Sequence, residues 1–335
     1  MIPAIFGLSG DTLTEDERAF FVEAAPAGFI LFERNCRDPE QVRRLTDSLR
    51  ALSGRSDVPI LIDQEGGRVA RLKPPAWPAF PAPQRFAQLY RRAPISAIEA
   101  ARANAQAIAL VLAEAGINVD CAPVLDLRRE GAHGVIGDRA LGADPMQVAA
   151  LGRAILDGLA AGGVCGVVKH VPGHGRAAAD SHFELPIVRE DGAELADDLY
   201  PFAALADAPM AMTAHILFPA WDPERCATLS RAVIVDVIRG RIGFDGLLMS
   251  DDIAMAALSG TLADRARGAI AAGCDLVLLG SGAIAENEAV ADALSAAAPT
   301  VLDRLDRAMK RVAGKTSSDP FDALAAKRDA LLAYA

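Results

Sequence analysis

The chain has 335 residues, of which 52% are hydrophobic and 23% are charged. This composition can build a large buried core and excludes intrinsic disorder for most of the chain. The formal net charge is −10 and no long run of Lys or Arg occurs, which argues against binding to nucleic acid or to an anionic membrane.

The sequence also bears on the cellular compartment. No segment contains the roughly 18 to 20 uncharged apolar residues that span a bilayer. The first residues lack the basic region and the apolar segment of a secretory signal. The five cysteines are scattered, without a CxxC pair, which indicates reduced thiols. We therefore expect a cytoplasmic protein that contacts no membrane.

Eight short apolar segments predict strands along the chain. Their interiors are nearly continuous apolar runs, which is typical of strands covered on both faces. The predicted strands are residues 4–8, 28–32, 59–62, 118–125, 163–169, 211–217, 246–249 and 275–279. Helical patterns separate most of them. Their signals are a capping-box pattern at Thr14 and Glu17, Pro39, an Ala-rich segment over 95–115, Asp144-Pro145, and residues 190–206.

Eight alternations of strand and helix with one composition throughout predict a single (β/α)8 TIM-type barrel of the α/β class over residues 1–335. Residues 286–335 are predicted to form a mainly helical tail docked on the barrel, with a final helix over 321–335. An open doubly wound sheet is the alternative, but no GxGxxG pattern follows the first strand. We expect a monomer.

In such barrels, catalytic residues lie at the carboxyl ends of the strands and in the loops that follow. Polar groups that end apolar strands are costly to desolvate unless they are paired or used. This rule selects four segments: Asp63–Arg71, Lys169–Gly175 with Asp180–His182, Thr213–His215 and Ser250–Asp252.

Purely structural roles compete with functional ones in these segments. Gly66-Gly67 could form only a tight turn that Asp63 caps. Asp252 is interpreted as the N-cap of the next helix, whereas Asp251 is assigned to the site because neighbouring strand residues face opposite ways.

The histidines carry weaker signals. His215 is interpreted as a hydrogen-bonded structural residue. His170 and His174 have a metal-ligand spacing only on a helix, and Pro172 breaks any helix there. Asp126, at the end of the fourth predicted strand, could be a local cap.

The segment KHVPGHG at residues 169–175, followed by DSH at 180–182, resembles the signature of glycoside hydrolase family 3, most closely its bacterial β-N-acetylhexosaminidases. IDQEGGRVARL (62–72), IGDRALG (136–142), MTAHILFP (212–219) and MSDDIAM (249–255) resemble the other family blocks in the same order. Val171 stands where the family usually has Phe. The sequence most resembles the compact cytoplasmic type used in peptidoglycan recycling, which lacks the large second domain of many members.

The resemblance implies residue roles. Asp251 matches the catalytic nucleophile, and His182 matches the general acid/base, oriented by Asp180. The sugar-binding positions match Asp63, Arg71, Arg139, Lys169 and His170. The implied substrate is a terminal β-linked N-acetylglucosamine, in the recycling enzymes attached to anhydro-N-acetylmuramic acid with or without its peptide.

The residue chemistry is consistent with these roles. Retaining glycosidases usually supply two carboxyl groups, but an unperturbed histidine titrates near pH ~6.5 and can also give and retake a proton. Asp180 can accept the ring N–H of His182 and so set its tautomer. Cations such as Lys169 and Arg71 would keep a nucleophilic Asp251 ionised. The small residues between His170 and His182 suggest a loop that moves the Asp180–His182 pair into the site.

Two other classes of protein remain open. A metal-dependent barrel hydrolase would use His170, His174, His182 and Asp251 as ligands. A non-catalytic sugar-binding protein could share the fold, because function is carried by the site. We expect a glycosidase that needs no metal and no organic cofactor, whose partner is a small amino-sugar or muropeptide.

Overall fold

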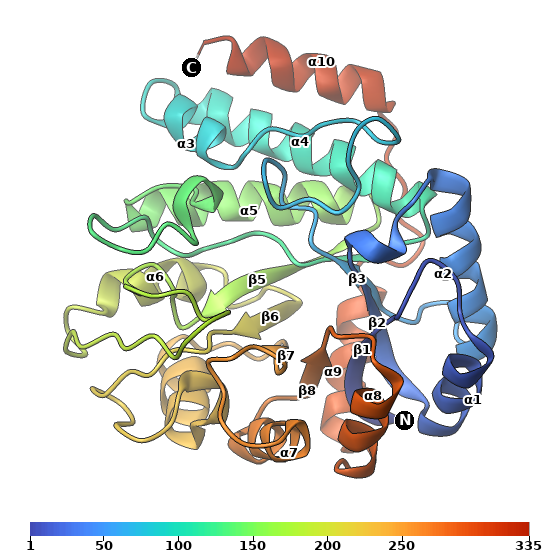
Figure 1. The fold of residues 1–335 in the computed structure, drawn as a ribbon. Helices are drawn as coiled ribbons and strands as arrows, with labels where there is room; N and C mark the ends of the chain where they lie inside the picture. The colour runs from blue at the N-terminus through green and yellow to red at the C-terminus, as the bar shows by residue number, and fades with distance from the viewer. Residues whose placement is uncertain (335) are drawn as a thin grey trace.

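The computed structural model describes residues 1–334 and forms a closed barrel of eight parallel strands in chain order (Figure 1). The last strand pairs with the first, with Ala4 opposite Val277, which closes the sheet. The strands are β1 Ile2–Gly7, β2 Pro26–Leu31, β3 Ile60–Ile62, β4 Val119–Asp120, β5 Cys165–Val171, β6 Met210–Thr213, β7 Leu247–Asp252 and β8 Leu276–Leu279. The predicted barrel is thus confirmed.

Helices surround the strands (Figure 1). The α-helices are α1 Glu15–Ala24, α2 Pro39–Ser53, α3 Gln84–Tyr90, α4 Pro94–Glu114, α5 Pro145–Ala161, α6 Ala196–Ala204, α7 Leu262–Ala272, α8 Ile284–Asp292, α9 Pro299–Lys310 and α10 Phe321–Leu332. Short 3₁₀ helices are η1 Glu33–Asn35, η2 Gly137–Arg139 and η3 Ala227–Leu229, and a π-helix, η4, covers Val233–Arg241.

The strands are apolar on both faces because each face meets a different core. In β8, Leu276 and Leu278 belong to the cluster inside the barrel, while Val277 and Leu279 belong to the layer between strands and helices. This two-sided burial explains the continuous apolar runs in the sequence.

The predicted helix starts at Thr14, Pro39 and Asp144-Pro145 are confirmed. The Thr14 hydroxyl accepts the amide of Glu17, and the Glu17 carboxylate accepts the amide of Thr14 at 2.8 Å. Asp38 and Asp144 cap α2 and α5, each directly before a proline at the first helical position. These caps satisfy amides that the first helical turn leaves unpaired.

The segments beyond α8 close one end of the barrel and cover one side of it. Apolar side chains of α9, among them Leu305 and Met309, belong to the interior cluster. Arg304 of α9 donates to Asp275, which precedes β8, at 2.9 Å. Helix α9 therefore covers the amino ends of the strands and leaves the carboxyl ends for a site. Helix α10 lies on α4 (Figure 1), where Arg328 donates to Asn104 at 3.2 Å.

Several predicted boundaries were wrong. Strand β4 is much shorter than 118–125, because the amide of Ala122 donates back to the carbonyl of Asp120 and Pro123 has no amide to donate. Strand β6 ends at Thr213, where the chain turns toward η3. Helix α6 begins at Ala196 rather than residue 190, because the Asp191 carboxylate accepts the amides of Ala193 and Glu194 in a preceding turn.

Two further boundaries concern α3 and the chain end. Helix α3 follows the Pro-rich loop and was not predicted. The last helix ends at Leu332, and residue 335 lies outside the described residues.

Helix α4 has the length and mean hydropathy, 1.2, of a membrane span. Its most apolar window is 56% buried within the molecule. It packs between α5 and α10 (Figure 1), which is the environment of a core helix.

Candidate active site

A cavity of about 310 Å³ opens at the carboxyl ends of the strands. Part of its floor is apolar and comes from Ile30, Met212 and Leu278. All eight residues nominated from the sequence line it: Asp63, Arg71, Arg139, Lys169, His170, Asp180, His182 and Asp251. The barrel brings them together because parallel strands present their carboxyl ends at one rim. Their chemical roles remain predictions.

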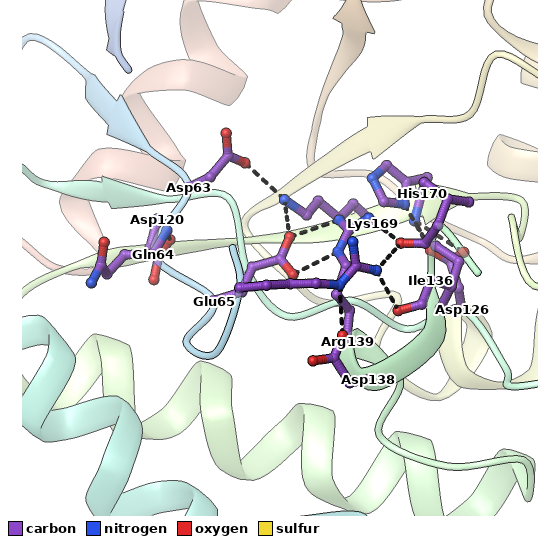
Figure 2. Close-up of polar contacts among 12 residues, drawn as sticks. Asp63, Gln64, Glu65, Asp120, Asp126, Ile136, Asp138, Arg139, Lys169 and His170 are labelled. Atoms are coloured by element: carbon purple, nitrogen blue, oxygen red, sulfur yellow. Dashed lines mark hydrogen bonds and ion pairs between the residues drawn. The ribbon is translucent and has the colours of Figure 1, made fainter. Parts of the chain in front are cut away.

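Lys169 is the centre of an ion network in this cavity (Figure 2). Its ammonium lies 2.9 Å from Asp63 Oδ1 and 2.7 Å from Glu65 Oε1. Asp63 also accepts Arg71 Nη2 at 2.9 Å. Glu65 accepts two parallel bonds from Arg139, at 2.8 and 2.7 Å. Three cations and two carboxylates thus hold one another in fixed positions.

The network keeps all its members charged. Burial favours a raised pKa for Asp63, but the charges of Lys169 and Arg71 outweigh it and hold the pKa well below its usual range. Burial also opposes ionisation of Glu65, yet Arg139 and Lys169 lower its pKa to about 2. The pKa of Lys169 is raised despite burial, because both carboxylates favour the ammonium. Charged groups of this kind form strong hydrogen bonds to sugar hydroxyls.

Glu65 is a site residue that the sequence reasoning missed. It lies two residues after Asp63, a spacing that places both side chains on one side of an extended segment. Gly66 and Gly67 do form the tight turn considered from the sequence, with positive φ values of 94° and 59°. Asp63 does not cap it, because its oxygens face Lys169 and Arg71.

Gln64 holds this loop from beneath. Its side-chain oxygen accepts the amides of Arg71 and Leu72, both at 3.0 Å, and its side-chain nitrogen donates to the carbonyl of Leu72 at 2.9 Å. Asp120 Oδ1 in turn accepts the Gln64 amide at 3.0 Å.

The second carboxylate oxygen of Asp120 is buried without a partner among the described residues. A small cavity of about 20 Å³ lies beside it. Burial is the main cause that raises the Asp120 pKa to about 7.

Asp126 aligns two histidines. Its Oδ2 lies 2.7 Å from His170 Nδ1, and its Oδ1 accepts the His174 amide at 2.6 Å (Figure 2 shows the first contact). Burial opposes ionisation of Asp126, but the histidine contacts lower its pKa. An ionised Asp126 sets the His170 tautomer with Nδ1 protonated, so Nε2 is left for a ligand. Asp126 is therefore a positioning residue for His170 rather than the local cap considered from the sequence.

Asp251 is the second-last residue of β7 and lies beside the cavity. Its Oδ1 accepts the Asp252 amide at 2.8 Å, the one hydrogen bond to this carboxylate within residues 1–334. Burial opposes ionisation, but His170, His215 and the amide outweigh it, so the Asp251 pKa lies below its ordinary value. An ionised carboxylate with a free oxygen is what nucleophilic attack requires.

His215 is structural, as predicted. Its Nδ1 lies 2.8 Å from the Thr228 hydroxyl, and its Nε2 lies 3.0 Å from the Asp252 carbonyl. Burial lowers its pKa, so the ring is neutral near pH 7.

Asp252 also lines the cavity, so the expectation that only one of the two neighbours faces the site was wrong, although the hydrogen bonds of Asp252 are structural. Its Oδ1 accepts the amides of Ala254 and Gly280, at 2.9 and 3.1 Å, and so binds β7 to the end of β8. The prediction that it caps the next helix was wrong, because α7 is capped by Thr261.

Asp180 and His182 lie at the rim. His182 Nδ1 is 2.8 Å from Asp180 Oδ1, which also accepts the His182 amide at 3.0 Å. These bonds outweigh a burial effect and lower the Asp180 pKa. The His182 side chain is 62% exposed, so its imidazole faces the solvent-side opening of the cavity.

Within residues 1–334, no three His, Cys, Asp or Glu side chains lie close enough together to hold a metal ion. His170 and His174, two ligands of the metal-hydrolase alternative, contact Asp126 and Ser181 instead. The donor set considered from the sequence therefore does not form a ligand cluster in the described part of the chain.

Comparisons with known proteins agree with the barrel fold. Residues 9–314 match the N-terminal domain of glycosyl hydrolase family 3. A β-hexosaminidase from Chromobacterium violaceum is 40% identical over an alignment of 342 positions, which covers 99% of this chain and 92% of that protein. The crystal structure of NagZ from Neisseria gonorrhoeae with N-trifluoroacetyl-D-glucosamine has a TM-score of 0.85 at 31% identity, over 99% of this chain and 97% of that one. The same protein in complex with a zinc ion has a TM-score of 0.83 at 31% identity, over 99% and 96% of the two chains.

The raised pKa of Asp120 predicts a pH dependence of stability. Between the unfolded value of 3.8 and the folded value of about 7, the folded protein binds a proton that the unfolded chain lacks, so stability falls as pH rises. Asp120→Asn keeps the acceptor for Gln64 and removes the titration. From pH 5 to pH 8 the variant should gain about 2 kcal/mol relative to the parent in urea unfolding.

Asp222→Asn is the control for this measurement. The Asp222 pKa is lowered, because its hydrogen bonds to Ser230 and to backbone amides outweigh burial. Asp222 is ionised above pH 5 in both the folded and the unfolded protein. The substitution Asp222→Asn should therefore change stability by the same amount at pH 5 and at pH 8. Equal pH slopes for the parent and Asp120→Asn would contradict the burial account of Asp120.

Proposed function

Since this chain belongs to glycosyl hydrolase family 3 and is a β-N-acetylhexosaminidase, we propose that it removes terminal N-acetylglucosamine through a covalent sugar ester on Asp251. The observation that carries this proposal is the ionised Asp251 carboxylate beside a cavity whose wall bears the Lys169 network. His182, oriented by Asp180, is the proposed general acid/base.

In the first step an Asp251 oxygen attacks the anomeric carbon and the glycosidic bond breaks. The departing oxygen takes a proton from His182 Nε2, since Nδ1 faces Asp180. In the second step water gives a proton back to His182 and attacks the same carbon. The ester bond then breaks, Asp251 is restored, and the sugar leaves with its original anomeric configuration.

The charged wall is proposed to bind the sugar. Asp63, Arg71, Arg139, Lys169 and His170 supply fixed donors and acceptors for hydroxyls and for the acetamido group. A cavity of about 310 Å³ is at the small end of the range for ligand sites, which suits one terminal residue and therefore exo action. Helix α9 closes the opposite end of the barrel, so the leaving group must lie toward the rim.

The natural substrate is proposed to be N-acetylglucosaminyl-anhydro-N-acetylmuramic acid, with or without its peptide, as in peptidoglycan recycling. The family resemblance supports this substrate. We also propose that the enzyme is monomeric and cytoplasmic and that it uses no metal or organic cofactor. The Neisseria NagZ complex with an N-acylated glucosamine supports recognition of the amino sugar.

Asp251 and Asp252 provide a matched pair of variants. Asp251→Asn should reduce kcat by at least about 10⁴-fold, because the amide is a poor nucleophile. Asp252→Asn keeps the Oδ1 acceptor for Ala254 and Gly280 and should retain substantial activity. Steady-state hydrolysis of an aryl β-N-acetylglucosaminide by both purified variants checks this. The opposite order of activities would assign the nucleophile to Asp252.

His182→Ala should act differently on two substrates. A sugar leaving group needs protonation, so hydrolysis of the natural disaccharide should fall by about 10²-fold or more. An activated aryl group departs without much help, so its first step should be nearly unchanged. Water attack would still lack its base, so stopped-flow traces should show a burst of aryl product followed by slow turnover. Equal losses on both substrates without a burst would remove His182 from the acid/base role.

A further inference from the structure

The loop after β5 presents two kinds of side chain. Asp180, Ser181 and His182 all line the cavity, but of the three only Ser181 is buried, with 3% of it exposed. Its hydroxyl lies 3.2 Å from Nε2 of His174, and its carbonyl accepts the amide of Ala257 at 3.2 Å. The acid/base pair is thus attached to the barrel through the residue that separates its two members.

His174 is suited to hold this residue rather than to transfer protons. It is 4% exposed, and burial, reinforced by the nearby His170, lowers its pKa to about 4. A neutral imidazole can donate to a hydroxyl or accept from one. Its backbone amide is in turn fixed by Asp126 at 2.6 Å. His174 is therefore held at both its main chain and its ring.

We propose that the His174–Ser181 hydrogen bond positions the acid/base pair, Asp180 and His182, over the cavity. His174 and Ser181 are thus positioning residues that act through His182. This inference rests on the proposed function, because it takes His182 as the acid/base. The bond fixes Ser181, and the neighbouring Asp180 and His182 are thereby held at the rim.

Asp126, which fixes the amide of His174, also contacts a residue proposed to bind the sugar. Asp126 Oδ2 contacts the ring of His170, and Asp126 Oδ1 holds the amide of His174. A hydrogen-bonded series therefore runs from His170 through Asp126 and His174 to Ser181. The sugar-binding histidine and the acid/base loop share one fixed reference group.

Other contacts anchor the base of the loop independently. Arg176 donates to Asp198 at 2.7 Å and to Glu190 at 3.2 Å. The amide of His133 donates to the carbonyl of Ala177 at 2.9 Å. Loss of the Ser181 hydroxyl should therefore release only the tip of the loop and leave the barrel folded.

Ser181→Ala tests the proposal on the two substrates used for His182. Hydrolysis of the disaccharide should fall about tenfold, while the first step on the aryl glycoside should stay within about twofold, because only the former depends on the acid. In the His182→Ala background, Ser181→Ala should cause no further loss on the disaccharide, because the two residues act as one unit.

Ser230→Ala is the control for loss of a buried hydroxyl. Ser230 is fully buried on the outer layer and donates to Asp222 at 2.6 Å. Its variant should lower the melting temperature without changing the ratio of the two substrate rates.

The outcomes distinguish the positioning role of Ser181 from the acid/base role of His182. Equal losses on both substrates in Ser181→Ala, or a further loss in the double variant, would overturn the positioning role. If His182→Ala itself fails to distinguish the substrates, the acid/base assignment fails instead. A substrate-specific loss in both single variants, with no further loss in the double variant, supports both roles.

Discussion

The buried ammonium of Lys169 is the charge on which the rest of the site depends. It lies 2% exposed at the end of β5, and burial of such a charge is costly unless opposite charges and hydrogen bonds compensate it. Asp63 and Glu65 supply that compensation, and Arg71 and Arg139 then pair with the same carboxylates. Removal of Asp63 would leave Arg71 without its carboxylate partner, and removal of Glu65 would do the same to Arg139. The network therefore fixes the loop after β3, the η2 segment and the end of β5 against one another.

The site divides into a rigid part and an exposed part. The groups proposed to bind the sugar and to attack it come from strand ends, from the loop after β3 and from η2, and buried ion pairs hold most of them. The proposed proton donor is on a loop, with a largely exposed imidazole. This division suits a reaction in which the sugar stays in place while leaving groups of different size depart toward the rim. It also explains why a single buried contact such as His174–Ser181 can influence one step more than the other.

The barrel could be predicted from the sequence because strands buried on both faces are continuous apolar runs, as in β7 and β8. It nominated residues that all line the cavity, since strand ends and family motifs point to the same rim. It missed Glu65, Asp120 and the role of Asp126, because their importance comes from partners distant in sequence: Lys169, Gln64 and His170. It misjudged β4 and α6, where Pro123 and the turn at Asp191 interrupt the pattern. Such interruptions depend on local hydrogen bonds that hydrophobic periodicity does not report.

The central claim is that Asp251 becomes covalently bonded to the sugar. A 2-acetamido sugar with a fluorine at C5 and a good leaving group should form the ester quickly and release it slowly. Mass spectrometry of the digested enzyme should then find the added sugar on a peptide containing Asp251, with fragment ions that assign it to that residue. We expect one sugar per chain, bonded to Asp251. Stable labelling of another residue would contradict it, as would turnover that inverts the anomeric configuration of the released sugar in NMR spectra.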